Sequence, residues 1–491
     1  MIEEGTDEAA VQTTLDKFSA WLSQKLPEPP KAKENLQKFA KLHDRRCYQL
    51  IRFCFNPDSD YRTVVKALKE IKKRIGESTQ LGILDSLTPL LYRVSQLIYN
   101  KSHVAPIVEF SRTDEFGLGA TAHEVLKEMS GSNPAVFKAN VKALSDLLQE
   151  QSPTSGSPDS TGAVDTLKAC AGFAKSYPKD MPQERKLLQA LVSFALTGAP
   201  PAAAKHAVTI LMHSANRKEL YATDLVKRCI KDFQFGEEHF LAKLACLSQL
   251  ALLAPDQCED DQKAIKELVT DIIVKVRTPK PNDENDEDSK SAWAEDSDLD
   301  DEIKAKLLAL RVLVNRLRAH ADVPTPGNAG VVKSLNKIVA NEGEPLKTKN
   351  APATHRSRLR LAAAQHLLKL ATYRTYDDLI TPVEFNRLAV VAQDSCLQVR
   401  QGFINKLKKY LSSGKLNSRY YTIVFLMATE TEESWREEVV TWIRARGQQV
   451  SKAANGTGSN VMEGIFARLM SLLVHHPDFG TQVKDLTDFS K

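Results

Sequence analysis

Residues 381–411, TPVEFNRLAVVAQDSCLQVRQGFINKLKKYL, decide how this chain folds. A helix is expected to begin at Pro382, because the first helical position needs no N–H group. A short polar turn that contains Asp394 follows it. A second helix then starts with the pair Val399-Arg400, and its apolar residues recur at helical spacing. This apolar stripe consists of Ile404, Leu407 and Leu411.

An aspartate in the turn and a Val-Arg pair early in the second helix are typical of a HEAT repeat, a pair of antiparallel helices. One repeat cannot bury its apolar face alone, so a stack of repeats is expected. At ~40–47 residues per repeat, roughly ten repeats would fit. Weaker echoes begin near Asn133, Pro200 and Arg356. We therefore predict an all-α solenoid, in which Asp394 and Arg400 make structural contacts between repeats.

The composition is ordinary for a soluble protein, with 42% hydrophobic and 26% charged residues. No run of about 18 apolar residues occurs, which argues against a membrane-spanning helix. The first eight residues are acidic and lack an apolar core, so we expect no secretory signal there. None of the seven cysteines forms a Cys-x-x-Cys pair. Buried thiols in a reducing compartment, cytosol or nucleus, are predicted.

Charge is unevenly distributed along the chain. Residues 278–302 hold eleven acidic and two basic side chains, a net charge of −9, so the remainder carries +14 within the total of +5. A basic scaffold attracts DNA or an acidic partner over long range. The alternative is an evenly spread charge that only favours solubility.

The loops divide the chain into segments. We predict a first helical-repeat segment over 1–150, middle HEAT repeats over 164–277, an acidic flexible linker over 278–302 and C-terminal HEAT repeats over 303–491, all in one continuous solenoid. Residues 151–163, rich in Ser, Pro and Gly, are expected to form a flexible insertion. The run Thr422–Met427 would suit a buried strand, but its helical neighbours favour a buried helix.

Ten segments, spread in order over residues 33–485, carry a family resemblance. They include Asn35–Arg46, Leu84–Val104 with its Leu-Ile-Tyr-Asn-Lys-Ser-His-Val sequence, and His475–Phe479. The others are residues 60–69, 121–128, 198–207, 251–257, 358–363, 380–382 and 398–401. Through these segments the chain resembles the cohesin-associated HEAT-repeat family named for precocious dissociation of sister chromatids.

The resemblance implies a hook-shaped helical scaffold in the nucleus, bound to chromatin. It implies binding of the kleisin subunit of cohesin, joint action with the wings-apart-like release factor and the cohesin ATPase subunits, and support of cohesin acetylation. Release and maintenance of sister-chromatid cohesion would both be regulated. We predict no cofactor, although the resemblance alone would allow an inositol phosphate. Family members are longer, so we expect a central or C-terminal fragment.

The preferred partner site is the segment from Tyr92 to His103, which mixes apolar residues with polar-tipped ones. Tyrosine and arginine are common anchors at interfaces. The alternative is that the tyrosines belong to the core, with their hydroxyls bonded inside the fold. The predicted kleisin-binding residues are Tyr92, Arg93, Tyr99, Asn100, Lys101 and His103.

Three basic clusters are candidates for contact with DNA phosphates or an acidic partner, and such contacts would weaken with salt. The alternative for each is a solvated face. No aromatic residues are interleaved with them, so sequence-specific reading of bases is not expected. The clusters are Lys66, Lys69 and Lys73; Arg356, Arg358 and Arg360; and Lys406, Lys408 and Lys409.

Signals for catalysis are weak. Gly117–Ala122 fits a dinucleotide template, but no strand precedes it, so a loop entering a helix is expected. Asp296, Asp298 and Asp300 begin like a calcium loop that lacks its glycine and final glutamate, and we interpret them as the start of a helix near residue 303. The histidines show no metal-ligand spacing. We predict a non-enzymatic scaffold; the alternatives are another HEAT adaptor, such as a transport receptor or phosphatase scaffold, or an enzyme with a hidden site.

Overall fold

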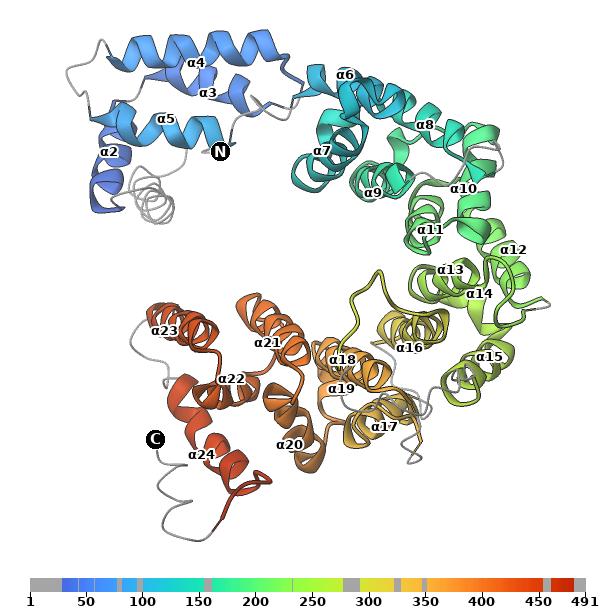
Figure 1. The fold of residues 1–491 in the computed structure, drawn as a ribbon. Helices are drawn as coiled ribbons and strands as arrows, with labels where there is room; N and C mark the ends of the chain where they lie inside the picture. The colour runs from blue at the N-terminus through green and yellow to red at the C-terminus, as the bar shows by residue number, and fades with distance from the viewer. Residues whose placement is uncertain are drawn as a thin grey trace. The chain divides into compact units, whose positions relative to one another are not determined.

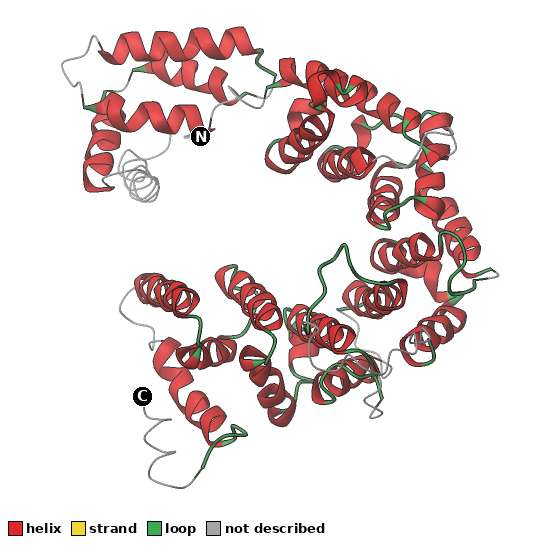
Figure 2. Ribbon diagram, viewed as in Figure 1, coloured by secondary structure: helices red, strands yellow, loops and turns green. Residues whose placement is uncertain are grey.

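The computed structural model describes residues 29–42, 44–56, 58–76, 82–94, 100–153, 161–231, 233–276, 292–321, 328–346, 351–453 and 461–480. Throughout these ranges the regular structure is helical and no strand occurs (Figure 2). None of the described helices is both long and apolar enough to cross a membrane. The predicted all-α fold is therefore confirmed.

The chain divides into two compact units. Unit 1 comprises residues 1–194 and 198–218, and unit 2 comprises residues 195–197 and 219–491. The helices of unit 1 are labelled in Figure 1. They are α2 (Pro29–Lys41), α3 (Arg45–Phe55), α4 (Tyr61–Gly76), α5 (Ile83–Val94), α6 (Lys101–Thr113), α7 (Gly119–Ser132), α8 (Val141–Glu150), α9 (Thr161–Ser176), most of α10 (Arg185–Thr197) and α11 (Ala202–Ser214).

Helices α2 to α5 enclose the first core of unit 1. Helix α4 buries Val64, Leu68, Ile71 and Ile75, which recur at the helical spacing of an amphipathic face. Helix α3 begins at Asp44, whose carboxylate accepts the backbone N–H groups that the first turn leaves without partners. After these four helices, α7, α9 and α11 pack side by side.

Unit 2 is itself a stack of helices in two layers (Figure 1). Helix α13 packs on α16, α16 on α18 and α18 on α21, while α15 packs on α16, and α17 packs on both α18 and α20. The helices are α12 (Lys218–Ile230), α13 (Phe240–Leu253), α14 (Pro255–Glu259), α15 (Gln262–Val274), α16 (Asp301–Ala319), α17 (Asn328–Ala340), α18 (Ala353–Leu370), α19 (Arg374–Asp377), α20 (Pro382–Val390), α21 (Leu397–Ser412), α22 (Tyr421–Phe425), α23 (Glu433–Ala453) and α24 (Val461–Val474).

The stretch 381–411 forms the predicted pair of helices, α20 and α21. Pro382 occupies the first turn of α20, and Thr381 and Glu384 cap that turn reciprocally. In α21, Val399 and the predicted apolar stripe are buried, together with Phe403. Residues 422–427 are helical and largely buried in α22 and the short 3-10 turn after it, so the predicted buried helix is also confirmed.

Several other sequence expectations have structural outcomes. All seven cysteines are buried free thiols, as predicted. Residues 154–160 of the predicted insertion and residues 278–291 of the predicted acidic linker lie outside the described residues. The last two residues of that linker belong to α16, and Asp300 caps α16 by accepting the N–H of Ile303 at 2.9 Å. Of the aspartates in the calcium-like sequence, Asp300 therefore caps a helix, while Asp296 and Asp298 lie in the turn before it.

Candidate partner-binding surface

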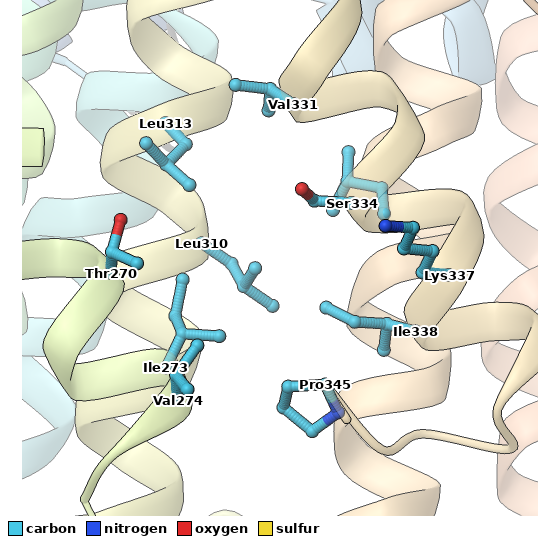
Figure 3. Close-up of a pocket in the computed structure, with 11 residues that line it drawn as sticks. Thr270, Ile273, Val274, Leu310, Leu313, Val331, Ser334, Lys337, Ile338 and Pro345 are labelled. Carbon is cyan, nitrogen blue, oxygen red and sulfur yellow. The ribbon is translucent and has the colours of Figure 1, made fainter. Parts of the chain in front are cut away.

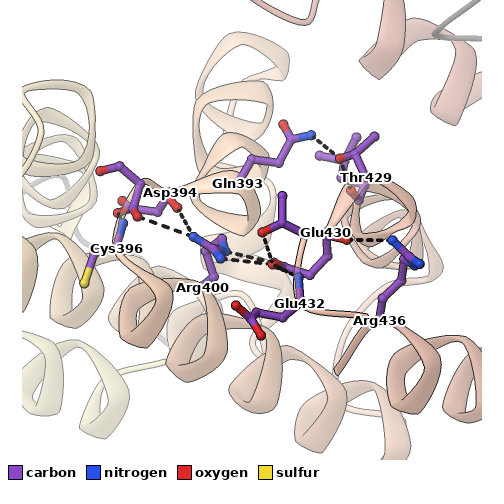
Figure 4. A network of polar contacts seen from close by, with 11 residues as sticks. Gln393, Asp394, Cys396, Arg400, Thr429, Glu430, Glu432 and Arg436 are labelled. Atoms are coloured by element: carbon purple, nitrogen blue, oxygen red, sulfur yellow. Dashed lines mark hydrogen bonds and ion pairs between the residues drawn. The ribbon is translucent and has the colours of Figure 1, made fainter. Parts of the chain in front are cut away.

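A ladder of ion pairs joins consecutive repeats of unit 2 (Figure 4). Asp394 accepts from Arg360 of α18, with 2.8 Å between Nη2 and Oδ1. Arg400 of α21 donates to the backbone oxygen of Asp394 at 2.8 Å and pairs with the carboxylate of Glu430. Arg436 of α23 donates to the backbone oxygen of Glu430 at 3.0 Å. We call these five residues the edge ladder, and they confirm that Asp394 and Arg400 are structural.

The edge ladder is buried enough for its charges to depend on one another. The Arg400 and Glu430 side chains are 14% and 3% exposed. Burial raises the pKa of Glu430. Hydrogen bonds from Arg400 and from the backbone N–H of Glu432 outweigh that effect, so the net pKa is below its usual value. Glu430 therefore stays ionised at neutral pH, and its pair with Arg400 holds α21 against the turn before α23.

The predicted arginine cluster at the start of α18 separates into different roles. Arg358 stacks on the ring of Trp293 at 4.5 Å and pairs with Asp296, which ties residues 292–300 to α18. Arg360 belongs to the edge ladder. Arg356 lines a pocket of about 390 Å³, together with Arg387 of α20. Of these three predicted residues, Arg356 alone has no hydrogen-bond or ion-pair partner from its side chain among the described residues.

The layer formed by α13, α16, α18 and α21 is almost free of acids. Its only acidic residues are Asp301 and Glu302, in the first turn of α16. Glu302 is buried and paired with Lys306. Fourteen basic residues stand against these two: Lys243, Lys304, Lys306, Arg311, Arg316, Arg318, Arg356, Arg358, Arg360, Lys369, Arg400, Lys406, Lys408 and Lys409. Positive charge is thus concentrated in one layer of unit 2.

Four basic side chains of this layer act electrostatically on one histidine, His366 of α18. They come from three adjacent helices: Arg311 and Arg318 from α16, Lys369 from α18, and Lys406 from α21. These four residues and His366 are all half-buried. We call this group the cationic track. Tyr410 lies beside it, because the ammonium group of Lys406 stands 5.2 Å from the Tyr410 ring centre.

The charges of the cationic track act on the buried imidazole of His366. Burial, and then the charges of Lys369, Arg311, Lys406 and Arg318, lower the pKa of His366 to about 3. Burial also lowers the pKa of Lys406, and Lys409 and Arg318 add to that effect. His366 is therefore neutral at physiological pH. Each neighbouring charge that acts on it is positive.

The cationic track and the edge ladder lie toward opposite ends of the same helices. In α18, Arg360 precedes Lys369 by nine residues, about 13 Å along a helix. In α21, Arg400 precedes Lys406 by six residues. Gln365 of α18 donates to the backbone oxygen of Gly402 in α21 at 2.9 Å, midway between the two groups. The two helices therefore keep the ladder and the track apart.

The predicted kleisin-binding segment lies in unit 1, and the structure describes part of it. Tyr92 is 39% exposed, and its hydroxyl accepts from Lys72 at 2.7 Å. Asn100 is buried: it caps α6 and donates to the backbone oxygen of Ser59 at 3.0 Å. The His103 ring packs on Tyr61, with 5.3 Å between ring centres. Tyr92 is therefore exposed, and His103 is half-buried.

The remaining residues of that segment are placed unevenly. Lys101 is the first residue of α6 and is half-buried, with its backbone oxygen accepting from Asn140 at 3.1 Å. Arg93 belongs to α5, although its side chain is not among those described, and Tyr99 lies outside the described residues. The kleisin assignment of this segment stays a prediction.

The other predicted basic residues divide by element. Lys66, Lys69 and Lys73 are exposed on α4. On α21, Lys408 pairs with Glu438 at 2.7 Å, Lys409 is exposed and Lys406 belongs to the cationic track. Contact of these residues with DNA remains a prediction. Across the described ranges, no group of three or more His, Cys, Asp or Glu side chains is arranged to hold a metal ion.

A separate apolar pocket of about 190 Å³ lies between α15, α16 and α17. Ile273, Leu310, Leu313 and Ile338 converge on it, and Lys337 stands among the α17 side chains that line it (Figure 3). Its walls come from both layers of unit 2. It contains one basic side chain, so its chemistry differs from that of the cationic track.

Sequence reasoning missed most of the cationic track. Arg311, Arg318, His366 and Lys369 were not among the predicted site residues, because they lie far apart in the sequence and no short motif joins them. A signal was nevertheless present: the predicted helices that contain them lack acidic residues beyond the first turn of α16. Counting acids for each helix would have marked the layer.

Comparisons with known proteins extend over the full chain. The family model described as "Sister chromatid cohesion protein PDS5 protein" matches residues 1–491. The chain is 27% identical to the sister chromatid cohesion protein pds5 of Schizosaccharomyces pombe, over 97% of this chain and 38% of the relative. Its identity to the PDS5 of Saccharomyces cerevisiae is 23%, over 95% and 38% respectively. To the human PDS5 homolog A it is 24%, over 97% and 37%. The chain thus spans less than two-fifths of the length of these relatives.

Proposed function

This chain belongs to the PDS5 family of sister chromatid cohesion proteins, and from that premise we propose that it is a non-enzymatic scaffold of the cohesin machinery. The observation that carries the proposal is the family match along all 491 residues, together with a helical stack that presents a basic layer. Stacked repeats offer extended surfaces that suit long partner segments. The role is to hold cohesin components rather than to transform a substrate.

The proposed central partner is the kleisin subunit of cohesin, bound as an extended or helical segment along the repeats. The wings-apart-like release factor and the cohesin ATPase subunits are proposed as further partners, so that the scaffold influences both release of cohesin and maintenance of cohesion. This role places the protein in the nucleus, on chromatin. Inositol phosphate remains a proposed ligand by family resemblance.

Non-specific binding of duplex DNA is a second proposed activity. It is favoured by the exposed lysines Lys66, Lys69 and Lys73, which recur at i, i+3 and i+7 on α4. Such a row neutralises phosphates without reading the base sequence. It lies in unit 1 and does not include the cationic track.

The decisive experiment titrates the purified chain against overlapping labelled kleisin peptides by fluorescence anisotropy. We expect at least one peptide to bind with a dissociation constant below roughly 100 μM, a free energy of binding that a specific peptide contact readily supplies. A scrambled version of the binding peptide serves as the control. If every peptide stays free, while peptides from a transport cargo or a phosphatase subunit bind, the chain is a HEAT adaptor of another class.

A further inference from the structure

Arg311 is the residue that points to a ligand. Its guanidinium is half-buried on α16, yet it forms no hydrogen bond or ion pair with any residue that the structure describes. Burial lowers its pKa, which shows that the position is unfavourable for a lone charge. Buried charges are usually paired, because removing them from water is costly. A carboxylate from outside the fold would supply the missing partner.

Two other basic side chains near Arg311 also lack an acidic partner. Arg318, two turns after Arg311 in α16, donates to the amide oxygen of Asn315 at 3.0 Å and pairs with no acid. Lys406 of α21 contacts the Tyr410 ring and likewise pairs with no described acid. By contrast, the arginines near the helix starts, Arg360 and Arg400, are each paired with a carboxylate. Arg311, Arg318 and Lys406 thus share the lack of an acidic partner among the described residues.

The dimensions of the cationic track suit a peptide better than a single small anion. Neighbouring packed helices lie about 8–10 Å apart, so three helices place their cations over roughly 20 Å. Arg311 and Arg318 are seven residues apart, about 10 Å along α16. A chain with acidic side chains at several positions spans such a surface, since an extended chain covers about 3.3 Å per residue. Tyr410 adds an aromatic ring that can pack against the chain.

We propose that the cationic track binds an acidic segment of a partner protein, with its Asp or Glu carboxylates on Arg311, Arg318 and Lys406. The guanidinium groups would take carboxylates in a two-point geometry, which a lysine cannot reproduce. The excess of positive charge in the layer would disfavour basic segments by repulsion. This inference deepens the proposed function and rests on it only for the partner's identity: the kleisin segment that occupies unit 2 should be acidic.

The test uses the full chain and a defined probe. A labelled peptide of alternating glutamate and alanine is titrated by anisotropy, beside the same peptide with glutamine in place of glutamate. The double variant Arg311→Gln/Lys406→Gln removes two charges from the cationic track. The matched control, Lys333→Gln/Lys337→Gln, removes two exposed charges from α17. Circular dichroism confirms that both variants fold.

We expect the glutamate peptide to bind the wild-type chain and the control alike, and the track variant at least about tenfold more weakly, because each charged hydrogen bond contributes about 1.5–3 kcal/mol. Equal weakening in both variants, or no preference for glutamate over glutamine, would overturn the inference. Binding of duplex DNA or inorganic tripolyphosphate to the cationic track, without binding of the acidic peptide, would also overturn the inference. Kleisin peptides are titrated in parallel: kleisin binding that is insensitive to the track variant refutes the inference and leaves the proposed function intact.

Discussion

Arg400 of α21 and Glu430, in the turn before α23, form a two-point ion pair with N–O distances of 2.8 and 3.0 Å. Removing one partner of a buried pair strands the other, at a cost of about 3–5 kcal/mol. We expect Arg400→Ala to lower the free energy of unfolding of unit 2 by about 3 kcal/mol. Urea denaturation followed by the fluorescence of Trp435 and Trp442, both on α23, measures the loss.

Lys408→Ala is the matched control for this pair. Its partner Glu438 is 65% exposed, so the expected loss is below about 1 kcal/mol. The double variant Arg400→Ala/Glu430→Gln should lose less than the sum of its single changes, since the stranded carboxylate is gone. Equal losses for Arg400→Ala and Lys408→Ala would contradict the structural role of the edge ladder.

Gly343 allows α17 to connect to α18. Its φ is +100°, and an added Cβ would lie 2.0 Å from the backbone oxygen of Arg356. Gly343→Ala should therefore cost at least about 2 kcal/mol, from backbone strain and the clash together. Gly330→Ala, in open space on α17, should instead stabilise the helix by about 0.5–1 kcal/mol. Thermal unfolding of both variants checks whether Gly343→Ala lowers the stability while Gly330→Ala raises it.

His366 makes the chain sensitive to acid. Its pKa in the folded chain is about 3, well below the value in an unfolded chain, about 6.5. Between these two pH values His366 is protonated in the unfolded chain but not in the folded chain. The free energy of unfolding therefore falls as the pH drops from about 6.5 toward 3. His366→Gln should flatten the dependence of the unfolding free energy on pH below about 6.5.

Urea midpoints measured at about pH 7.5 and pH 5.5 on both chains test this expectation. His206 keeps the same effect in the variant, because burial and the charges of Lys205, Lys168 and Lys175 lower its pKa to about 4. The stability of unit 1 should therefore still depend on acid pH in the variant. If the unfolding free energy of unit 2 changes with pH equally in the wild type and in His366→Gln, then His366 is not the group responsible.

Tyr92 and His103 are the described side chains that best test the partner site predicted in unit 1. We expect Tyr92→Ala/His103→Ala to weaken kleisin peptide binding by about tenfold, because truncated interface anchors typically cost more than 1 kcal/mol. Leu118→Ala, another change at an exposed position of unit 1, should leave binding unchanged. Anisotropy titration compares them. Undiminished binding by the double variant would confine kleisin contacts to other surfaces.

The lysines of α4 should govern any binding to DNA. Changing Lys66, Lys69 and Lys73 to glutamine removes up to three phosphate contacts, so the slope of log K against log salt should become shallower by about 2–3. Titrations with a duplex at about 50 and 200 mM salt measure the slope. Lys333→Gln/Lys337→Gln, on α17, should keep the wild-type slope. An unchanged slope in the α4 variant would assign DNA binding to other residues.

The helix boundaries and buried helix faces of this chain can be predicted from its sequence. Pro382, the polar turn at Asp394 and the stripe ending at Leu411 are short-range signals, and each corresponds to an observed helix boundary or buried face. The pairing of Thr381 with Glu384 also had a signal, because a threonine followed three residues later by glutamate is a capping box. The periodicity of buried residues is sufficient to define such elements.

Contacts between repeats were harder to foresee. Arg358 was predicted to contact phosphates. In the structure it stacks on Trp293 and pairs with Asp296, which lie more than sixty residues earlier in the sequence. His366 owes its low pKa to charges on α16 and α21, which are far away in the sequence. A single sequence states which residues are charged, but not which helices lie beside each other. The candidate surface therefore became visible only when three helices were placed together.

The edge ladder has a mechanical consequence for α18, α21 and the turn before α23. At one end of these helices, ion pairs through Asp394 and Glu430 resist separation. At the other end of α18 and α21, the charges that act on His366 are all positive and repel one another. We therefore expect the two helices to move most easily by rotating about the paired end, so that their far ends separate or approach. An acidic partner that neutralises the cationic track would lower the energy of the closed position.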